Sequence, residues 1–177
     1  MDKVEDCRVI LSNLGLPRAQ CTRIAAYTVL ALADLTKFSP WSAAKRRSLR
    51  IHDILVFVKR EYQKTYAENT RETIRRQVLH QLEQASVADR NSDDPMLPTN
   101  SPRTHYAISE AALRVLRTFG THRFEEEAHN FQLSKGSLWK IYQAGRQKHL
   151  IPVRLPSGKK IQFSPGKHNN SAGGSDK

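Results

Sequence analysis

The sequence predicts a mainly α-helical fold with short β-hairpins, in which two helices form a helix-turn-helix and a strand-loop-strand unit forms a wing. Three observations support this prediction. Apolar residues recur at helical spacing along most of the first half of the chain, a segment typical of a helix start separates two of the expected helices, and a proline-rich loop follows between two short apolar segments. With 177 residues, the chain is long enough to bury a core.

Residues 1–50 are predicted to form an N-terminal helical support. The segment Val4–Leu14 has apolar residues at helical spacing, and Gly15 is expected to end that helix. Pro17 suits the first turn of a second helix. The stretch Ile24–Ala33 has no charge on any face, so we expect this second helix to be buried at the centre of the domain.

Residues 51–120 are predicted to contain the helix-turn-helix and its wing-like loop. Helical periodicity predicts a third helix over Ile51–Tyr62 and a fourth over about Thr70–Gln84. Asn69 and Glu72 have the three-residue spacing of a capping box at the start of the fourth helix. Two helices joined by a few residues, of which the second is rich in arginine, are typical of a helix-turn-helix.

A wing is expected directly after the fourth helix. The segments Val87–Arg90 and His105–Ile108 are predicted strands, and the prolines of Asn91–Thr104 disfavour a helix and favour a loop. Ser109 is expected to cap a further amphipathic helix that Gly120 ends.

The remaining residues are expected to form a smaller C-terminal part. Residues 121–163 are predicted to contain helices and a β-hairpin, and residues 164–177 a disordered tail. The elements expected there are an acidic helix over Phe124–Phe131, a helix from Ser134 to about Lys148, and strands over Ile151–Leu155 and Lys160–Phe163.

Positive charge is concentrated in two parts of the chain. The net charge is +12, and residues 37–80 alone carry eleven Lys and Arg against four Asp and Glu. Residues 135–177 carry nine against one. Such clustering favours a polyanionic partner such as nucleic acid, because each neutralised phosphate releases condensed counterions. A basic surface that serves only solubility is the alternative.

The fourth predicted helix has the residues that we expect to contact bases. At about 100° per residue, Ile74, Val78 and Leu82 share its apolar face. The polar face carries Thr73, Arg76, Gln77 and His80. Arg can bond guanine bidentately, Gln can bond adenine, and the Thr methyl group can contact thymine. The alternative is an ordinary surface helix with a solvated polar face.

Two arginines of this helix do not fit that division. Arg71 and Arg75 fall toward its apolar side. We expect Arg71 to extend to solvent from the first turn and Arg75 to pair with a carboxylate such as Asp53 or Glu61.

Further residues are candidates for contacts with DNA phosphates. They lie in the basic connector, at the start of the fourth helix, where backbone N–H groups favour an anion, and in the later part of the loop. They are Lys45, Arg46, Arg47, Arg50, Asn69, Thr70, Arg71, Asn100, Ser101 and Arg103. As alternatives, the charge run is a solvated face and the loop is a surface loop shaped by its prolines.

The sequence predicts neither a catalytic nor a metal site. It has no P-loop, GxGxxG, GxSxG or HExxH motif, and no lysine has Asp or Glu two positions before it, as restriction-type nucleases require. Cys7 and Cys21 are the only cysteines and lack zinc-site spacing. Without a long apolar stretch or a signal peptide, the chain is expected to be cytoplasmic, with no membrane partner.

Three stretches resemble the N-terminal region of PstI/BsuBI-type restriction endonucleases. They are Tyr66–Gln84, Asn91–Pro102 and Ser164–Asn169, and the resemblance covers most of residues 51–169. It implies a helix-turn-helix or winged-helix domain placed before a separate nuclease domain. Family members are type II enzymes of restriction–modification systems that are expected to cut CTGCAG with Mg²⁺ as homodimers.

In the family, the Ser164–Asn169 segment leads into the nuclease domain, whereas this sequence leaves the pattern at Asn170. The resemblance therefore implies, as the alternative to a disordered tail, that residues 164–177 are a truncated linker to an absent nuclease domain. No catalytic residue is carried over, and the chain is expected to be inactive alone and to hold no cofactor. The resemblance therefore predicts a DNA-binding domain with double-stranded DNA as its partner. A stand-alone transcriptional regulator and a docking module for a separate nuclease chain are the alternatives.

Overall fold

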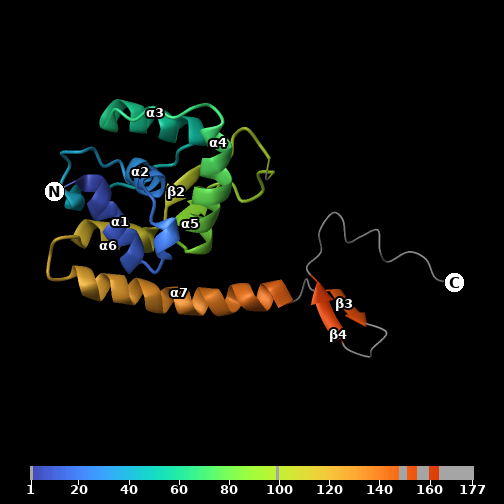
Figure 1. The fold of residues 1–177 in the computed structure, drawn as a ribbon. Coiled ribbons are helices and arrows are strands. Elements are labelled where there is room, and N and C mark those ends of the chain that lie inside the picture. Colours follow the sequence, from blue (N-terminus) through green and yellow to red (C-terminus); the bar gives the residue numbers. More distant parts are fainter. Residues whose placement is uncertain (1, 99, 148–150, 155–159, 164–177) are drawn as a thin grey trace. The chain divides into compact units, whose positions relative to one another are not determined.

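The computed structural model describes residues 2–98, 100–147, 151–154 and 160–163 (Figure 1). It forms two compact units, Met1–Lys135 and Gly136–Lys177. Every residue predicted to contact bases or phosphates lies in the first unit. The fourfold division into residues 1–50, 51–120, 121–163 and 164–177 stays a prediction.

The N-terminal helices enclose a central apolar helix, as predicted. Helix α1 (Lys3–Asn13) ends before Gly15, whose φ of 92° is readily adopted only by glycine. Every residue from Ala25 to Leu32 of helix α2 (Arg23–Leu32) is buried. Helix α2 packs against α1, α3 and the helical segment that follows α3, so it supports the whole helix-turn-helix (Figure 1).

Pro17 does not begin the second helix. It precedes a short 3₁₀ turn, η1 (Arg18–Gln20), and α2 begins only after Thr22. The Thr22 hydroxyl accepts a hydrogen bond from the Ala25 N–H at 3.2 Å, which is the cap that fixes the later start. A second 3₁₀ turn, η2 (Trp41–Ala43), lies in the basic connector.

The helix-turn-helix has the predicted extent. Helix α3 (Ile51–Tyr62) ends at Gln63, whose φ is 52°. The second helical segment consists of α4 (Thr70–Thr73), η3 (Ile74–Leu79) and α5 (His80–Gln84) in direct succession. We call this segment the reading helix. The turn η3 is π-helical, so its bonds join residues five apart and successive side chains rotate by less than in an α-helix.

The capping box predicted for Asn69 and Glu72 is wrong. The Asn69 backbone is itself helical, and its side chain makes no cap hydrogen bond. The helical turn begins earlier, because the Thr70 N–H already donates to the Ala67 carbonyl at 3.0 Å. The Glu72 carboxylate is occupied by arginines of the same helix instead.

The two predicted wing strands are confirmed. Strands β1 (Ala88–Arg90) and β2 (Tyr106–Ile108) pair antiparallel, with Ala88 opposite Ile108. Leu49 adds a one-residue bridge on the other side of β2, where it exchanges two backbone hydrogen bonds of 2.8 Å with Tyr106. This bridge ties the connector before α3 to the wing.

Polar side chains close the wing loop and start the next helix. The Asn91 N–H donates to the His105 carbonyl, and the His105 N–H donates to Asn91 Oδ1, both at 2.9 Å. Helix α6 (Glu110–Thr118) is capped by the Ser109 hydroxyl and is followed by Gly120 at φ 80°, as predicted.

The C-terminal helical region differs from the prediction. A single helix, α7 (Phe124–Gln147), replaces the two expected helices. Ser134 does not cap a new helix, since its hydroxyl donates back to the Phe131 carbonyl at 2.7 Å and stays within α7.

The predicted C-terminal hairpin is confirmed. Strands β3 (Ile151–Arg154) and β4 (Lys160–Phe163) pair antiparallel. The expected turn at residues 156–158 and the expected tail at residues 164–177 lie outside the described residues. None of the helices in the described ranges has the length and apolar character needed to cross a membrane.

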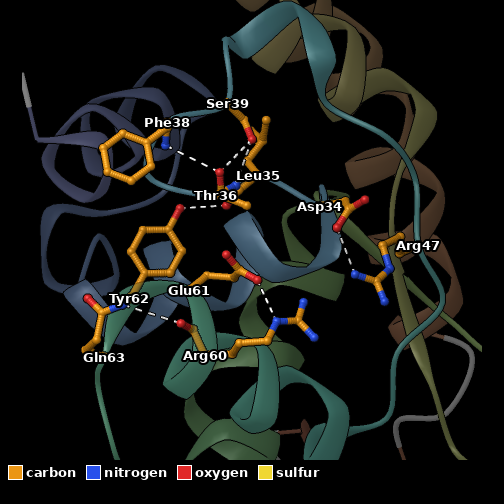
Figure 2. A network of polar contacts seen from close by, with 10 residues as sticks. All are labelled: Asp34, Leu35, Thr36, Phe38, Ser39, Arg47, Arg60, Glu61, Tyr62 and Gln63. Carbon is orange, nitrogen blue, oxygen red and sulfur yellow. Dashed lines mark hydrogen bonds and ion pairs between the residues drawn. The ribbon is translucent and has the colours of Figure 1, made fainter.

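A polar network joins the end of α3 to the loop after α2 (Figure 2). The buried Tyr62 hydroxyl donates to the Leu35 carbonyl at 2.6 Å, and burial raises the pKa of Tyr62. Nearby, Arg47 pairs with Asp34 at 2.8 Å. The Tyr62 bond ties the end of α3 to the loop after the central helix, and the Arg47 pair ties the connector to the same loop.

The Tyr62→Phe substitution should therefore lower stability. It keeps the ring but leaves the Leu35 carbonyl without its partner, at a cost of about 1 kcal/mol. Urea unfolding measures this loss as a lower midpoint at an unchanged slope. Tyr66→Phe is the matched control, because no hydrogen bond of the Tyr66 hydroxyl occurs among the described residues. Equal midpoints for the two variants would show that the Tyr62 bond does not stabilise the fold.

Candidate nucleic-acid interface

The four residues predicted to contact bases are exposed on the reading helix, while Ile74, Val78, Leu79 and Leu82 of the same helix are buried. The exposed set is Thr73, Arg76, Gln77 and His80. The Arg76 side chain is 72% exposed and pairs with Glu72. His80 bonds the Gln84 amide at 3.0 Å through its Nε2. The helix thus presents an uninterrupted polar face to solvent.

The predicted phosphate contacts of the basic connector differ in their surroundings. Lys45 is exposed. Arg46 donates to the Ile108 carbonyl at 2.8 Å and pairs with Asp89 at 2.9 Å, so it joins the connector to the wing. Arg47 is held by Asp34. A phosphate contact by Arg46 or Arg47 would use the guanidinium N–H groups outside these pairs.

The predicted phosphate contacts at the helix start and in the loop are accessible. Asn69, Asn100 and Arg103 are exposed, and Thr70 and Ser101 are half-buried. The Ser101 hydroxyl accepts the Arg103 N–H at 3.2 Å, so the loop is shaped partly by its own side chains.

An open cleft of about 570 Å³ lies between the start of α3, the reading helix and the end of the wing loop. It brings together four of the predicted phosphate contacts from three separate segments, namely Arg50, Arg71, Asn100 and Ser101. Its other lining residues are Ile51, His52, Glu72, Arg75, Pro102, Thr104 and Tyr106. Lys45, Arg46, Arg47, Asn69, Thr70, Arg103 and the four base-contacting candidates do not line it.

Arg71 and Arg75 of this cleft are held by exposed partners, and Arg50 pairs with the half-buried Asp53 at 3.2 Å. Arg75 does not pair with Asp53 or Glu61, as the sequence suggested, but with Glu72 at 2.7 Å. The Arg75 guanidinium is the main cause that lowers the pKa of Glu72. A carboxylate three positions earlier on the same helix is within easy reach of an arginine, which explains this choice of partner.

Arg71 has two partners. It pairs with Glu68 at 2.9 Å and lies 3.0 Å from Nδ1 of His52. Helical periodicity alone did not assign a role to His52, and it placed Arg71 and Arg75 toward the apolar side. The π-helical turn and the open first turn of the reading helix leave both arginines exposed.

Neither cysteine lies in a metal or redox site. Cys7 and Cys21 are buried, and burial raises the pKa of both thiols. Within the described ranges, no three His, Cys, Asp or Glu side chains form a group that could hold a metal ion.

A helix-turn-helix followed by a two-stranded wing defines a winged helix-turn-helix domain. Residues 1–140 match the family of the BsuBI/PstI restriction endonuclease HTH domain, and the chain belongs to this family.

Similar proteins support this membership. The chain is 34% identical to the type II restriction enzyme BsuBI of Bacillus subtilis over 94% of this chain and 52% of that enzyme. It is 27% identical to the type II restriction enzyme AplI of Arthrospira platensis over 91% of this chain and 49% of that enzyme. The structure of the SdaI restriction endonuclease matches with a TM-score of 0.72 and 27% identity, over 97% of this chain and 56% of that one. The chain spans about half the length of the curated relatives that it matches.

The wing loop should be sensitive to pH through His105. Its Nδ1 lies 2.9 Å from the Arg103 carbonyl and its Nε2 contacts the Asp93 carboxylate, so the ring satisfies both acceptors only as the doubly protonated cation. The Arg103 carbonyl and then the Asp93 carboxylate raise the pKa of His105 above its usual 6.5. The protonated His105 ring stabilises the folded wing loop. This stabilisation is complete below pH 6.5 and is lost as the pH rises through the raised pKa of His105.

An NMR titration of the His105 ring should therefore give a pKa above 6.5. Asp93→Asn removes one of the two causes and should lower the measured pKa. A value at or below 6.5 in the unaltered chain would contradict the two-acceptor arrangement.

Proposed function

We propose that the unit Met1–Lys135 is the DNA-binding domain of a type II restriction endonuclease and that it recognises CTGCAG. One observation carries the proposal. The helix in the reading position of the helix-turn-helix exposes side chains that can bond base edges, and a cleft lined by arginines lies beside it. Family membership supports the restriction-endonuclease context.

In this mechanism the reading helix enters the major groove. Arg76 bonds a guanine through O6 and N7, Gln77 bonds an adenine, and Thr73 and His80 contact neighbouring bases. Arg76 gives up Glu72 as it does so. Phosphate contacts on both sides of the groove fix the helix in place. They are made by Lys45, Arg46, Arg47, Arg50, Asn69, Thr70, Arg71, Asn100, Ser101 and Arg103.

The symmetry of the target bears on assembly. CTGCAG is a palindrome, so two copies of this chain related by a twofold axis would present the same helix to each half. We include such a homodimer on DNA in the proposal.

The Arg76→Ala substitution tests base contact. Binding titrations use one labelled duplex with CTGCAG and one with a scrambled site. The substitution should weaken binding to CTGCAG by about 1–3 kcal/mol and leave the scrambled duplex nearly unaffected. Equal losses on both duplexes would reassign Arg76 to a phosphate. Binding of a promoter operator in preference to CTGCAG would favour the stand-alone regulator.

The Lys45→Gln substitution tests phosphate contact. It should weaken binding to both duplexes alike, and the slope of log K against log salt should fall by about 1. An unchanged slope would remove Lys45 from the interface. Absence of any salt-dependent DNA binding by the unaltered chain would reject the proposed function and favour the docking module.

A further inference from the structure

The cleft beside the reading helix contains more cationic groups than the proposed function uses. Arg50, Arg71 and Arg75 line it together with His52, and they come from two helices. Opposite them lies the end of the wing loop with Asn100 and Ser101. This concentration of donors around one open space is typical of a site for an oxyanion.

The carboxylates that hold Arg71 and Arg75 are exposed, whereas Arg50 pairs with the half-buried Asp53 at 3.2 Å. Glu68, the partner of Arg71, has an 81% exposed side chain, and Glu72, the partner of Arg75, is 52% exposed. Exposed ion pairs contribute little to stability, so the exchange of a carboxylate for another anion costs little. The planar guanidinium matches a phosphate with two parallel hydrogen bonds as well as it matches a carboxylate.

Two further features of the cleft wall favour an anion. Ile51 and His52 are the first two residues of α3, a helix of 12 residues, and the N–H groups of a first turn have no partner within their helix. At the same helix start, the Asp53 carboxylate accepts the Arg50 N–H at 3.0 Å. Thr104 also lines the cleft, and its buried hydroxyl has no hydrogen-bond partner among the described residues.

Glu72 connects the cleft to the base-contacting face. Its carboxylate pairs with Arg75, which lines the cleft, and with Arg76, which is exposed on the polar face of the reading helix. A rotation of the Glu72 side chain away from both guanidinium groups would therefore free the two arginines together.

We propose that this cleft binds one phosphodiester group of the DNA backbone, and that Glu72 holds Arg75 and Arg76 until the phosphate and a base replace it. This inference rests on the proposed function. It adds Arg75 and His52 to the phosphate contacts and gives Glu72 the role of a competitor for DNA. Because Glu72 opposes both contacts at once, occupation of the cleft and base contact by Arg76 become coupled.

A phosphate scan tests the site. The unaltered chain is titrated with CTGCAG duplexes in which single phosphates are replaced by neutral methylphosphonates. Replacement of the one phosphate that the cleft binds should weaken binding by about tenfold, as expected for loss of a charged hydrogen bond. The Arg75→Gln variant should bind the intact duplex about tenfold more weakly than the unaltered chain does. In this variant, the methylphosphonate at that position should cause no further loss of binding. Arg114→Gln on α6, an exposed arginine outside the cleft, is the matched control and should keep the full effect of the replacement.

The role of Glu72 is tested by Glu72→Gln. Freed of this competitor, the chain should bind both CTGCAG and scrambled duplexes several-fold more tightly. Glu126→Gln on α7 changes the net charge equally at an exposed position and should have a smaller effect. Thermal melts verify that each variant is folded.

The outcomes separate the two proposals. If DNA binds but no methylphosphonate position depends on Arg75, or if Glu72→Gln and Glu126→Gln bind equally, the cleft inference is overturned and the proposed function stands. If the unaltered chain does not bind DNA, both are overturned.

Discussion

The burial of α2 is the constraint on which the rest of the structure depends. This helix has no charged residue after Arg23 and is enclosed by α1, α3 and η3. Each large apolar side chain that it buries contributes about 1.5–3 kcal/mol. Because α3 and the reading helix pack on the same helix, their relative orientation is set by the core. The polar face of the reading helix is therefore presented by a rigid support rather than by a loop.

Much of the fold follows from local patterns, and the exceptions have identifiable causes. Periodicity predicts α1, α3 and the reading helix, and the two short segments on either side of the proline-rich loop predict β1 and β2. The bridge at Leu49 was not predicted, because a single paired residue has no periodicity. The prediction of two helices in place of α7 was wrong. Serine is a residue type that often caps a helix, but the Ser134 hydroxyl donates to the Phe131 carbonyl within α7. The π-helical turn has no sequence signal that periodicity detects.

The site was predictable in part. The exposed set on the reading helix follows from the helical period, since an apolar face leaves the opposite face to solvent. The cleft does not, because it joins residues such as Arg50, Arg71 and Asn100 that are distant in sequence. Arg75 was placed toward the apolar side of the helix because a rotation of about 100° per residue was assumed throughout, whereas Ile74–Leu79 is π-helical. Charge clustering in residues 37–80 indicated an anionic partner. It could not show which of the arginines are already paired with carboxylates of the same chain.

NMR of the arginine side chains during a titration with a CTGCAG duplex tests the central claim most directly. The Nε–H signals report the partner of each guanidinium without any substitution. The account predicts that the signals of Arg75 and Arg76 shift together as both leave Glu72, while that of Arg114 on α6 stays in place. Signals of Arg75 and Arg76 that remain unchanged at saturating duplex would contradict it.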